Sequence, residues 1–420
     1  SEMCIRDRPT SIEVTKTMKI LHTSDWHLGH TLYNYDRTVE QQAFLRQLTR
    51  IVTEEQPDAM VVSGDIYHYS SPAAATQKMY TDAMLNIHQA CPEMTIVVTA
   101  GNHDSSSKLE IDSNLWQHFG LNVVGNIERT AEEVNLDKHI IEINNEKKTK
   151  GYVIAVPHVY PQNFPLLDTE TPRDQRQARF FQALLDEVKK RNTAQLPVVL
   201  MAHLSIEGSD RSGHDESIGG IEYVPLSAMG EGYDYLALGH IHCPQDIKGS
   251  HHHARYCGTP LPVSFDETYP HSVSIIELEK GAEPQISTRE IENPIPLVTL
   301  PHDPTPFEDA LKLLEEYPEE KPAYLRLNVL TKGYLPPDCN EKASNAAKGK
   351  ACKYCYIKTT RERQADTDES KPISIQEMQE MSPLEIARLY YRETEGEEMD
   401  PELCQLMETV MQKVKSKNNS

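Results

Sequence analysis

Residues 21–30 read LHTSDWHLGH, and this stretch decides how the rest of the chain is interpreted. It follows the strand-like run Lys19–Thr23 and changes abruptly from apolar to polar side chains. Asp25 and His27 are one residue apart, and an extended loop directs alternate side chains to one side of the backbone. A carboxylate and an imidazole presented together are typical ligands of divalent transition metals. The stretch therefore predicts part of a metal site at the end of a strand.

The same pattern recurs along the chain. Further apolar runs, each ending in polar residues, lie at Ala59–Ser63, Thr95–Thr99, Val198–Ala202 and Tyr235–Leu238. The polar ends supply Asp65, Asn102, His103, His203, His240 and His242. Helical periodicity is present over Val39–Glu55, Ala73–Ala90 and Phe180–Lys190. Strands that alternate with helices favour an α/β core, in which active sites lie at the carboxyl ends of strands.

These polar residues form a ligand set that suits two divalent metals. Three carboxylate or amide oxygens are combined with several imidazoles. Gly64, Gly101 and Gly239 each precede a candidate ligand, where a missing side chain lets the backbone approach closely. Each element alone is weakly specific, since a single buried His is more often a hydrogen-bonded core residue. Together the motifs are far more specific for a metal site, because five of them follow apolar runs in the order D-x-H, G-D, G-N-H-D, H and G-H-x-H.

Composition limits the class of protein. The 420 residues carry a net charge of −22 and are 38% apolar and 25% charged, which predicts a soluble globular chain of two or three domains. No apolar run approaches the roughly 18 residues of a membrane-spanning helix, and the first 17 residues lack the apolar centre of a signal peptide. Eight cysteines are too few for a disulfide scaffold, so we expect a reducing cytoplasm. The net charge argues against nucleic-acid binding on bulk electrostatics.

Four segments are expected along the chain. Residues 1–17 are predicted to be a disordered extension or an artefact, with Met18 as the natural start, and residues 18–266 form the metal-binding core. Its predicted elements include a hairpin of Ile140–Ile143 and Gly151–Val156. Residues 267–365 are predicted to form a small second domain, and residues 366–420 a helical tail. The strands and the helix expected in the second domain are Ser272–Leu278, Gln285–Ile291, Tyr324–Val329 and Phe307–Tyr317.

The tail contains two helix-start signals. Ser382-Pro383-Leu384-Glu385 combines a Ser cap with a Pro and a Glu, and Asp400-Pro401 repeats the cap and the Pro. The two amphipathic helices either pack against the main domain or dock a partner helix or coiled coil, and the pattern does not choose between these. Residues 366–420 carry a net charge of −7, which argues against DNA contact, whereas residues 331–363 carry +5.

Six segments of the chain resemble those of a known family. They read LHTSDWHLGH, VVSGDIYHYSSP, VVTAGNHDS, MAHLSIEG, YLALGHIHCPQ and YCGTPLPVSFDE. The series is similar to the calcineurin-like metallophosphoesterases and, within them, to the SbcD family of DNA-repair nuclease subunits. The resemblance is strong over Met18–Glu267 and looser beyond. It implies a four-layer αββα sandwich with metals between two β-sheets, a small α/β capping domain and a tail that binds an SMC-like ATPase of the SbcC type.

The resemblance also implies residue roles. Asp25, His27 and His242 would hold the first metal, Asn102, His203 and His240 the second, and Asp65 would bridge them. The family's usual metal is Mn²⁺, with Mg²⁺ as the alternative. His103 would face the scissile phosphate as an acid or transition-state stabiliser, with Asp104 orienting its imidazole. His68 stands where bacterial relatives more often have Asp, and it is left out of the ligand set.

The activity implied is a metal-dependent DNA nuclease subunit acting in repair, replication and recombination. It would be an ATP-dependent double-strand 3′–5′ exonuclease and a single-strand and hairpin endonuclease. The chain has no phosphate-binding P-loop, so ATP dependence must come from the partner. The subunit would be a homodimer within a heterotetramer, with Ala73–Ala90 as a candidate dimer helix, and would act on double-stranded ends and hairpins away from membranes. The alternatives are a nucleotide or small-molecule phosphoesterase and a non-catalytic scaffold.

Other candidate features have simpler interpretations. Residues 251–253, all His, are expected in a solvated loop, and Cys352 and Cys355 are expected to be free thiols because no second metal-binding pair is near them. Asp266 and Glu267 are interpreted as a structural pair. Residues 354–356 are expected in a solvated basic loop rather than at a DNA contact. Two metals would add about four positive charges where the phosphate must lie, but the whole chain carries −22. We therefore expect this chain alone to bind DNA weakly and with strong salt dependence, and the ATPase partner to supply much of the binding.

Overall fold

The computed structural model describes residues 17–129, 134–145, 148–212 and 223–361, with residues 384–388, 391, 399–400, 403–405 and 407. The chain divides into two compact units, residues 1–360 and 361–420. The first 16 residues of the predicted extension lie outside the described residues, and so does most of the two predicted tail helices. The described residues 384–388 and 403–405 are helical.

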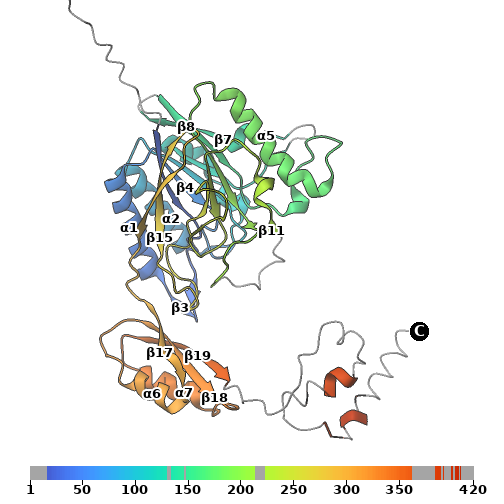
Figure 1. Ribbon diagram of the computed structural model, residues 1–420. Helices are drawn as coiled ribbons and strands as arrows, with labels where there is room; N and C mark the ends of the chain where they lie inside the picture. Colours follow the sequence, from blue (N-terminus) through green and yellow to red (C-terminus); the bar gives the residue numbers. More distant parts are fainter. Residues whose placement is uncertain are drawn as a thin grey trace, which may run out of the picture. The chain divides into compact units, whose positions relative to one another are not determined.

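Two six-stranded sheets form the core of the first unit (Figure 1). The first sheet has the order β16-β15-β1-β4-β5-β6, in which β1, β4, β5 and β6 are parallel. Its strands are β1 (Thr17–Thr23), β4 (Ala59–Ser63), β5 (Thr95–Thr99), β6 (Leu121–Val124), β15 (Ser272–Glu279) and β16 (Gln285–Glu290). The second sheet has the order β13-β14-β12-β9-β8-β7, in which β8, β9, β12 and β14 are parallel. Its strands are β7 (Ile140–Asn145), β8 (Lys148–Ala155), β9 (Val198–His203), β12 (Tyr235–Gly239), β13 (Gln245–Asp246) and β14 (Ala254–Tyr256).

The two sheets pack face to face around a buried apolar cluster. Ile20 and Val61 of the first sheet belong to the same cluster as Val199 and Tyr235 of the second. Leu21 points to the opposite face, because successive side chains of a strand alternate. Both faces of each sheet are therefore covered, which explains why its central strands are apolar throughout.

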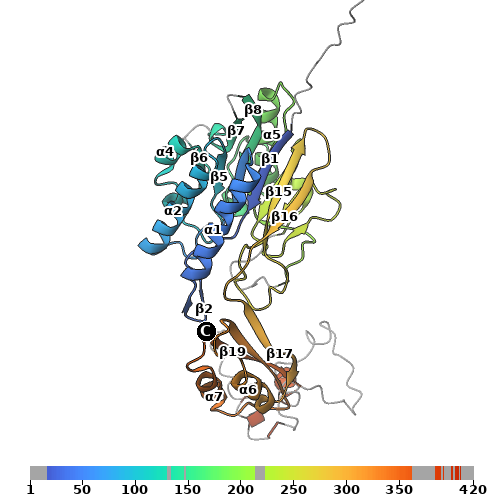
Figure 2. The same ribbon diagram turned by 90° about the vertical axis from the view of Figure 1, so that its left-hand side faces the viewer.

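Helices cover the outer faces of the sheets and complete four layers. The helices α1 (Thr38–Glu55) and α2 (Ala74–Ala90) lie over the first sheet (Figure 2), where Phe44 and Met84 enter the core. The helix α5 (Arg176–Arg191) covers the second sheet with Phe180 and Leu184. The predicted αββα sandwich is confirmed. The shorter elements are β2 (Thr31–Leu32), β3 (Tyr35–Asp36), β10 (Ser205–Ile206), β11 (Tyr223–Val224), α3 (Ser106–Leu109), α4 (Ser113–Trp116), η1 (Gln117–Phe119), η2 (Asp137–His139), η3 (Pro161–Asn163), η4 (Arg173–Gln175) and η5 (Leu226–Met229).

A third sheet, β17-β18-β19, forms a smaller layer with its own core. Its elements are β17 (Leu297–Thr305), α6 (Phe307–Glu315), β18 (Tyr324–Thr331), α7 (Cys339–Ala347) and β19 (Lys353–Arg361). Phe307 and Leu314 of α6 pack with Leu327 of β18. We call residues 297–361 the small domain. Residues 354–356, which were expected in a solvated basic loop, instead lie in β19.

The prediction that the second domain begins at residue 267 is wrong for two strands. β15 and β16 belong to the first core sheet, where β15 pairs antiparallel with β1 and sets Ile276 opposite Ile20. Ile276 and Leu278 extend the apolar cluster between the two sheets. Strand periodicity identifies a strand but not its neighbour, so the sequence pattern could not assign these two strands to a sheet.

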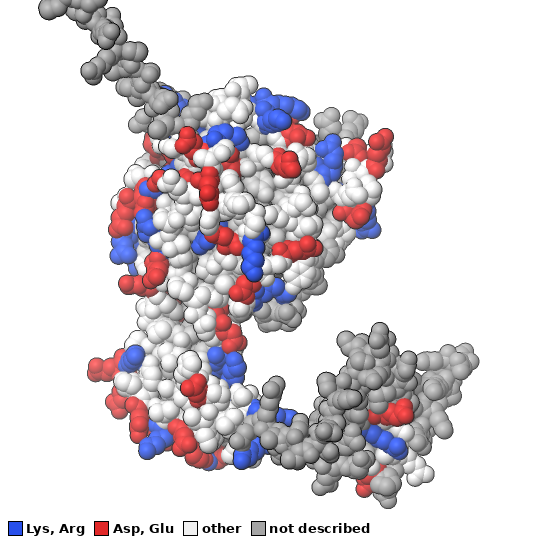
Figure 3. Space-filling view, in the orientation of Figure 1, with Lys and Arg blue, Asp and Glu red and all other residues white. Residues whose placement is uncertain are grey.

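Charge is mixed over the described surface. Figure 3 shows Lys and Arg side chains interspersed with Asp and Glu over the visible face of the molecule. Among the described residues, no helix is long and apolar enough to cross a membrane.

Candidate metal centre

The polar strand ends meet where the carboxyl ends of the two sheets face each other. One ligand atom each from Asp25, His27 and His242 lies within 4.8 Å of the others, and the same holds for Asp25, Asp65 and His203. Asn102 Oδ1 lies 3.0 Å from His203 Nε2 and 3.0 Å from His240 Nδ1. The structure thus brings together all seven residues that the sequence analysis proposed as ligands.

The backbone at this centre adopts conformations that L-residues usually avoid. Asp25, His27, Asp65 and His240 have positive φ angles of 53°, 45°, 51° and 99°. Such conformations cost on the order of 1–3 kcal/mol each and persist only where the surroundings enforce them. Four of the seven proposed ligands are held in this way, so the fold orients their side chains at a cost to its own stability.

Glycines let the strand ends approach each other. A Cβ atom on Gly64 would lie 2.2 Å from His203 Nδ1, and one on Gly101 would lie 2.1 Å from Asp65 Oδ1. At Gly239 it would lie 1.8 Å from the carbonyl oxygen of Ser63. A side chain at any of these positions would therefore displace a proposed ligand or separate the two sheets.

The first group consists of Asp25, His27 and His242. Nδ1 of His242 donates to Glu267 Oε1 at 3.0 Å, so the neutral imidazole presents the lone pair of Nε2. That Nε2 lies 3.3 Å from Nε2 of His27. Asp25 is fully buried, and burial raises the pKa of its carboxyl group. Two imidazole nitrogens and a carboxylate oxygen converge within 4.8 Å of one another, an arrangement that a cation stabilises.

The second group consists of Asn102, His203 and His240. Nδ1 of His203 donates to the carbonyl oxygen of Ser63 at 2.8 Å, which leaves Nε2 toward Asn102 Oδ1. Burial alone lowers the pKa of His203, but Asp65 outweighs burial and raises this pKa to about 9. The imidazole therefore carries a proton beside Asp65 unless another cation takes that place, which fits a metal-binding position.

Asp65 faces both groups through one oxygen. Its Oδ2 lies 3.9 Å from His27 Nε2 and 3.4 Å from His203 Nε2. Its Oδ1 accepts the backbone N–H of His103 at 2.9 Å. Burial alone would raise the pKa of Asp65, but His203 outweighs burial and holds this pKa well below its usual range. Oδ2 is thus the oxygen that faces both groups, while Oδ1 holds the backbone of His103.

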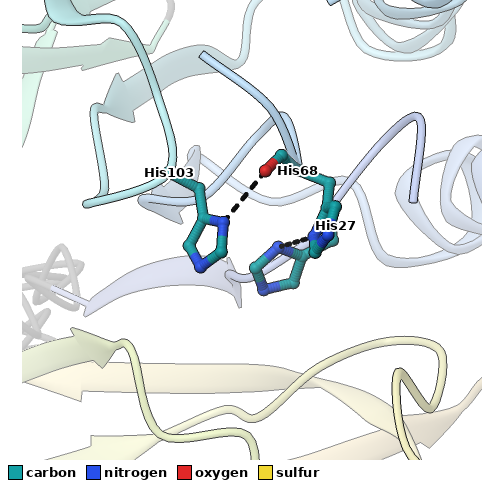
Figure 4. A group of neighbouring side chains, drawn as sticks. All are labelled: His27, His68 and His103. Atoms are coloured by element: carbon teal, nitrogen blue, oxygen red, sulfur yellow. Dashed lines mark hydrogen bonds between the residues drawn. The ribbon is translucent and has the colours of Figure 1, made fainter. Parts of the chain in front are cut away.

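His103 lies beside the first group rather than within it. Nδ1 of His103 donates to the carbonyl oxygen of His68 at 2.9 Å (Figure 4), so Nε2 is left for other partners. The His103 ring stands edge-on to the His27 ring, with centroids 4.9 Å apart. Nδ1 of His68 lies 3.4 Å from Nδ1 of His27. His68, which the sequence analysis left out of the ligand set, therefore contacts a proposed ligand.

Asp104 does not orient the His103 imidazole, contrary to our expectation. Its carboxylate accepts backbone N–H groups of Ile66, Tyr67 and Gly101 at 2.9–3.1 Å. Burial and the nearby Asp65 carboxylate raise the pKa of Asp104 to about 6. Asp104 thus fixes the backbone of the two loops that carry Asp65 and Asn102, while a backbone carbonyl orients His103.

Glu267 is a site residue that the sequence analysis missed. Besides the bond to His242, its Oε2 accepts the hydroxyl of Thr259 at 3.0 Å. A carboxylate that fixes the tautomer of a ligand His is a common partner in metal sites. The signal was present in the segment YCGTPLPVSFDE, but nothing local links residue 267 to residue 242.

The other candidate features lie away from the centre. Nδ1 of His252 lies 2.7 Å from Asp246 Oδ2, and Nδ1 of His253 donates to a backbone carbonyl. Cys352 is buried among apolar side chains of the small domain, and both it and Cys355 are free thiols.

Two family models match the chain. Residues 18–244 match the model described as calcineurin-like phosphoesterase, and residues 293–395 match the one described as Type 5 capsule protein repressor C-terminal domain. The SbcD subunit of nuclease SbcCD from Rhodobacter capsulatus is 33% identical over 309 residues, which cover 71% of this chain and 75% of that protein. The chain belongs to the SbcD family of nuclease subunits.

Two further members of the family support this assignment. The Escherichia coli K12 protein is 27% identical over 395 residues, covering 91% of this chain and 94% of that protein. The Bacillus subtilis protein is 31% identical over 277 residues, covering 63% of this chain and 68% of that protein. The family consists of metal-dependent nucleases that hydrolyse phosphodiesters, and at this level the predictions of a hydrolase and a nuclease are confirmed.

Proposed function

We propose that this chain is the nuclease subunit of an SbcCD-type complex, acting in DNA repair, replication and recombination. Its activities are an ATP-dependent double-strand 3′–5′ exonuclease and a single-strand and hairpin endonuclease. One observation carries the proposal: two groups of buried oxygen and nitrogen ligands converge on a shared oxygen of Asp65. Such an arrangement suits two-metal hydrolysis of a phosphodiester.

The residues fit two divalent cations, Mn²⁺ with Mg²⁺ as the alternative. Asp25, His27 and His242 would hold one, Asn102, His203 and His240 the other, and Asp65 would bridge them. When bound, such metals supply an activated water and neutralise charge on the phosphate oxygens. The mixture of carboxylate, amide and imidazole ligands supports this choice, since thiolate ligands would favour softer metals.

His103 is the proposed catalytic residue. Because its Nδ1 is occupied by the carbonyl oxygen of His68, only Nε2 can act on the substrate. A proton on Nε2 would pass to the departing 3′ oxygen or stabilise the charge that develops there. The backbone N–H bond from His103 to Asp65 Oδ1 ties the position of this residue to the bridging carboxylate.

The partner is an SMC-like ATPase of the SbcC type, bound through the C-terminal helices. Relatives that are SbcD subunits of nuclease SbcCD support this proposal, as does the second family match, which extends to residue 395. The chain pairs with a second copy, with α2 as the candidate dimer helix, and acts on double-stranded ends and hairpins. The seven cysteines that the structure describes are free thiols, in keeping with a cytoplasmic location.

The test is a nuclease assay on hairpin and linear DNA with Mn²⁺, with and without an SbcC-type ATPase and ATP. We expect cleavage by the complex and at least a roughly hundredfold loss of rate in His103→Gln. His118→Gln, which changes an exposed His, is the matched control and should keep full activity. Absence of DNA cleavage by the complex, or rapid hydrolysis of a nucleotide phosphomonoester by the chain alone, would favour the phosphoesterase alternative.

A further inference from the structure

The small domain contacts the turn that ends at Glu267, the carboxylate that fixes the tautomer of His242. Residues 264–267 form a tight turn, closed by a hydrogen bond from the N–H of Glu267 to the carbonyl oxygen of Ser264 at 3.3 Å. Phe265 and Asp266 are the central residues of this turn, and Glu267 is its last residue. Any group that fixes the two central residues therefore also fixes where the Glu267 side chain begins.

Arg326 of β18 is that group. Its Nη1 donates to Asp266 Oδ1 at 2.7 Å, and its Nη2 donates to the carbonyl oxygen of Phe265 at 3.4 Å. The guanidinium also lies over the Phe265 ring, 5.2 Å from its centroid. The Arg326 side chain is only 6% exposed, whereas that of Asp266 is 54% exposed. The ion pair is therefore open to solvent on the Asp266 side, and the buried contacts of Arg326 with Phe265 hold the turn as well.

Arg326 is itself held by the small domain. Its Nε donates to Thr299 Oγ1 at 3.1 Å, and its Nη1 also donates to the hydroxyl of Tyr356 at 3.1 Å. β17, β18 and β19 thus each contribute to one rigid arginine position. Lys358 adds a weaker contact to Asp266 at 3.3 Å from a half-exposed side chain.

The small domain also contacts the β2–β3 hairpin, which follows Asp25 and His27 in the chain. The ring of Tyr33, at the tip of the β2–β3 hairpin, stacks on Tyr356 with centroids 4.7 Å apart and an interplanar angle of 24°. Leu32 packs with Phe265 and Tyr324 in one buried cluster. The segments that carry the first ligand group therefore continue directly into contacts with the small domain.

We propose that Arg326 is a positioning residue of the metal centre, which acts through the turn of residues 264–267 to hold Glu267 against His242. Docking of the small domain then sets the affinity of the first ligand group for its metal. The inference rests on the proposed two-metal function, because it assumes that His242 is a metal ligand.

The test is a double-mutant cycle on the full chain, with Mn²⁺ binding measured by titration calorimetry and by loss of the free Mn²⁺ signal in electron paramagnetic resonance. We expect Glu267→Ala to weaken Mn²⁺ binding about tenfold to a hundredfold and Arg326→Ala about tenfold. If Arg326 acts through Glu267, the double variant should bind as weakly as Glu267→Ala alone. Independent effects would instead multiply.

Other variants separate positioning from misfolding. Asp266→Asn removes the ion pair while leaving Arg326 and its aromatic contacts, and should weaken binding several-fold with an unchanged circular dichroism spectrum. Arg326→Lys should bind Mn²⁺ more tightly than Arg326→Ala but more weakly than the wild type. Arg50→Ala removes an arginine from an exposed ion pair and should keep the Mn²⁺ affinity of the wild type. The role of Arg326 would be refuted if folded Arg326→Ala and Asp266→Asn bound Mn²⁺ as tightly as the wild type, or if the effects in the cycle multiplied. Either outcome would leave the proposed metal centre standing. If the wild-type chain binds no Mn²⁺, the proposed metal centre itself fails.

Discussion

The close approach of the two sheets at the metal centre can be tested by adding one methyl group. Gly239, at the end of β12, would place a Cβ atom 1.8 Å from the carbonyl oxygen of Ser63 and 2.9 Å from Nδ1 of His203. An ordinary contact needs about 3.4 Å, so Gly239→Ala must move β12 away from β4 by roughly 1.6 Å. Gly239 has no positive φ angle, so the effect is purely steric.

The expected loss of stability follows from the cost of overpacking. An unrelieved methyl group in a packed interior costs about 1–3 kcal/mol. For a unit of 360 residues, with an unfolding entropy of about 2.1 cal/mol/K per residue, about 3 kcal/mol lowers Tm by about 4 °C. The displaced His203 should also weaken Mn²⁺ binding at least about tenfold, because its Nδ1 faces the new methyl group.

Differential scanning calorimetry and Mn²⁺ titration measure both effects. Gly333→Ala is the matched control, because a Cβ atom there meets nothing within 4 Å and Gly333 also has no positive φ angle. We expect the control to keep the Tm and the Mn²⁺ affinity of the wild type. If Gly239→Ala matched the control in both measurements, the strand ends could not be in contact as described, and the convergence of ligands from both sheets would be refuted.

Further predictions concern the groups around the ligands. Glu267→Gln keeps an acceptor for His242 but removes its charge, so calorimetry should show Mn²⁺ binding about tenfold weaker, with the exposed Glu277→Gln unchanged. Asp104→Ala leaves three backbone N–H groups without their acceptor and should lower the free energy of unfolding by about 2–4 kcal/mol in thermal unfolding. If Asp104→Ala instead kept the Tm and changed the pH optimum of cleavage, Asp104 would orient the His103 imidazole after all. Removing metal with EDTA should lower Tm, since a ligand at about 100 times its Kd contributes about 2.7 kcal/mol, and Mn²⁺ should restore it. DNA binding by the chain alone should weaken steeply between about 50 and about 200 mM salt in fluorescence anisotropy, and a flat response would contradict phosphate contacts at the metal centre.

Buried strands and regularly amphipathic helices could be predicted closely from the sequence. The strands β4 and β5 have the bounds that their apolar runs predicted, and the helices α1 and α2, which bury one face, differ from prediction by one residue at their starts. Uniform burial produces an unbroken apolar run, and the polar residues that end it mark the carboxyl end of the strand. The local signal is complete in such cases.

Strands without an apolar run and the sheet to which a strand belongs were harder to predict. β19 was expected to be a basic loop because its Lys and Tyr residues suggested solvation, yet it pairs in the third sheet and its side chains are mostly half-buried or exposed. β15 and β16 were recognised as strands but placed in the second domain, whereas they belong to the first core sheet. The neighbour of a strand is set by contacts between residues distant in the chain, which no local pattern contains.

The sequence by itself determined which side chains could serve as ligands and that each follows a strand. Ligand chemistry is a property of residue type, and the end of an apolar run shows where a strand turns into a loop. Only the tertiary structure decided that one oxygen of Asp65 faces both groups, that Asp104 binds backbone rather than His103, and that Glu267 fixes His242. These relations depend on atoms brought together from distant parts of the chain, such as His27 and His242, which are 215 positions apart. Hydrogen-bond partners and tautomers are therefore set by packing between the two sheets.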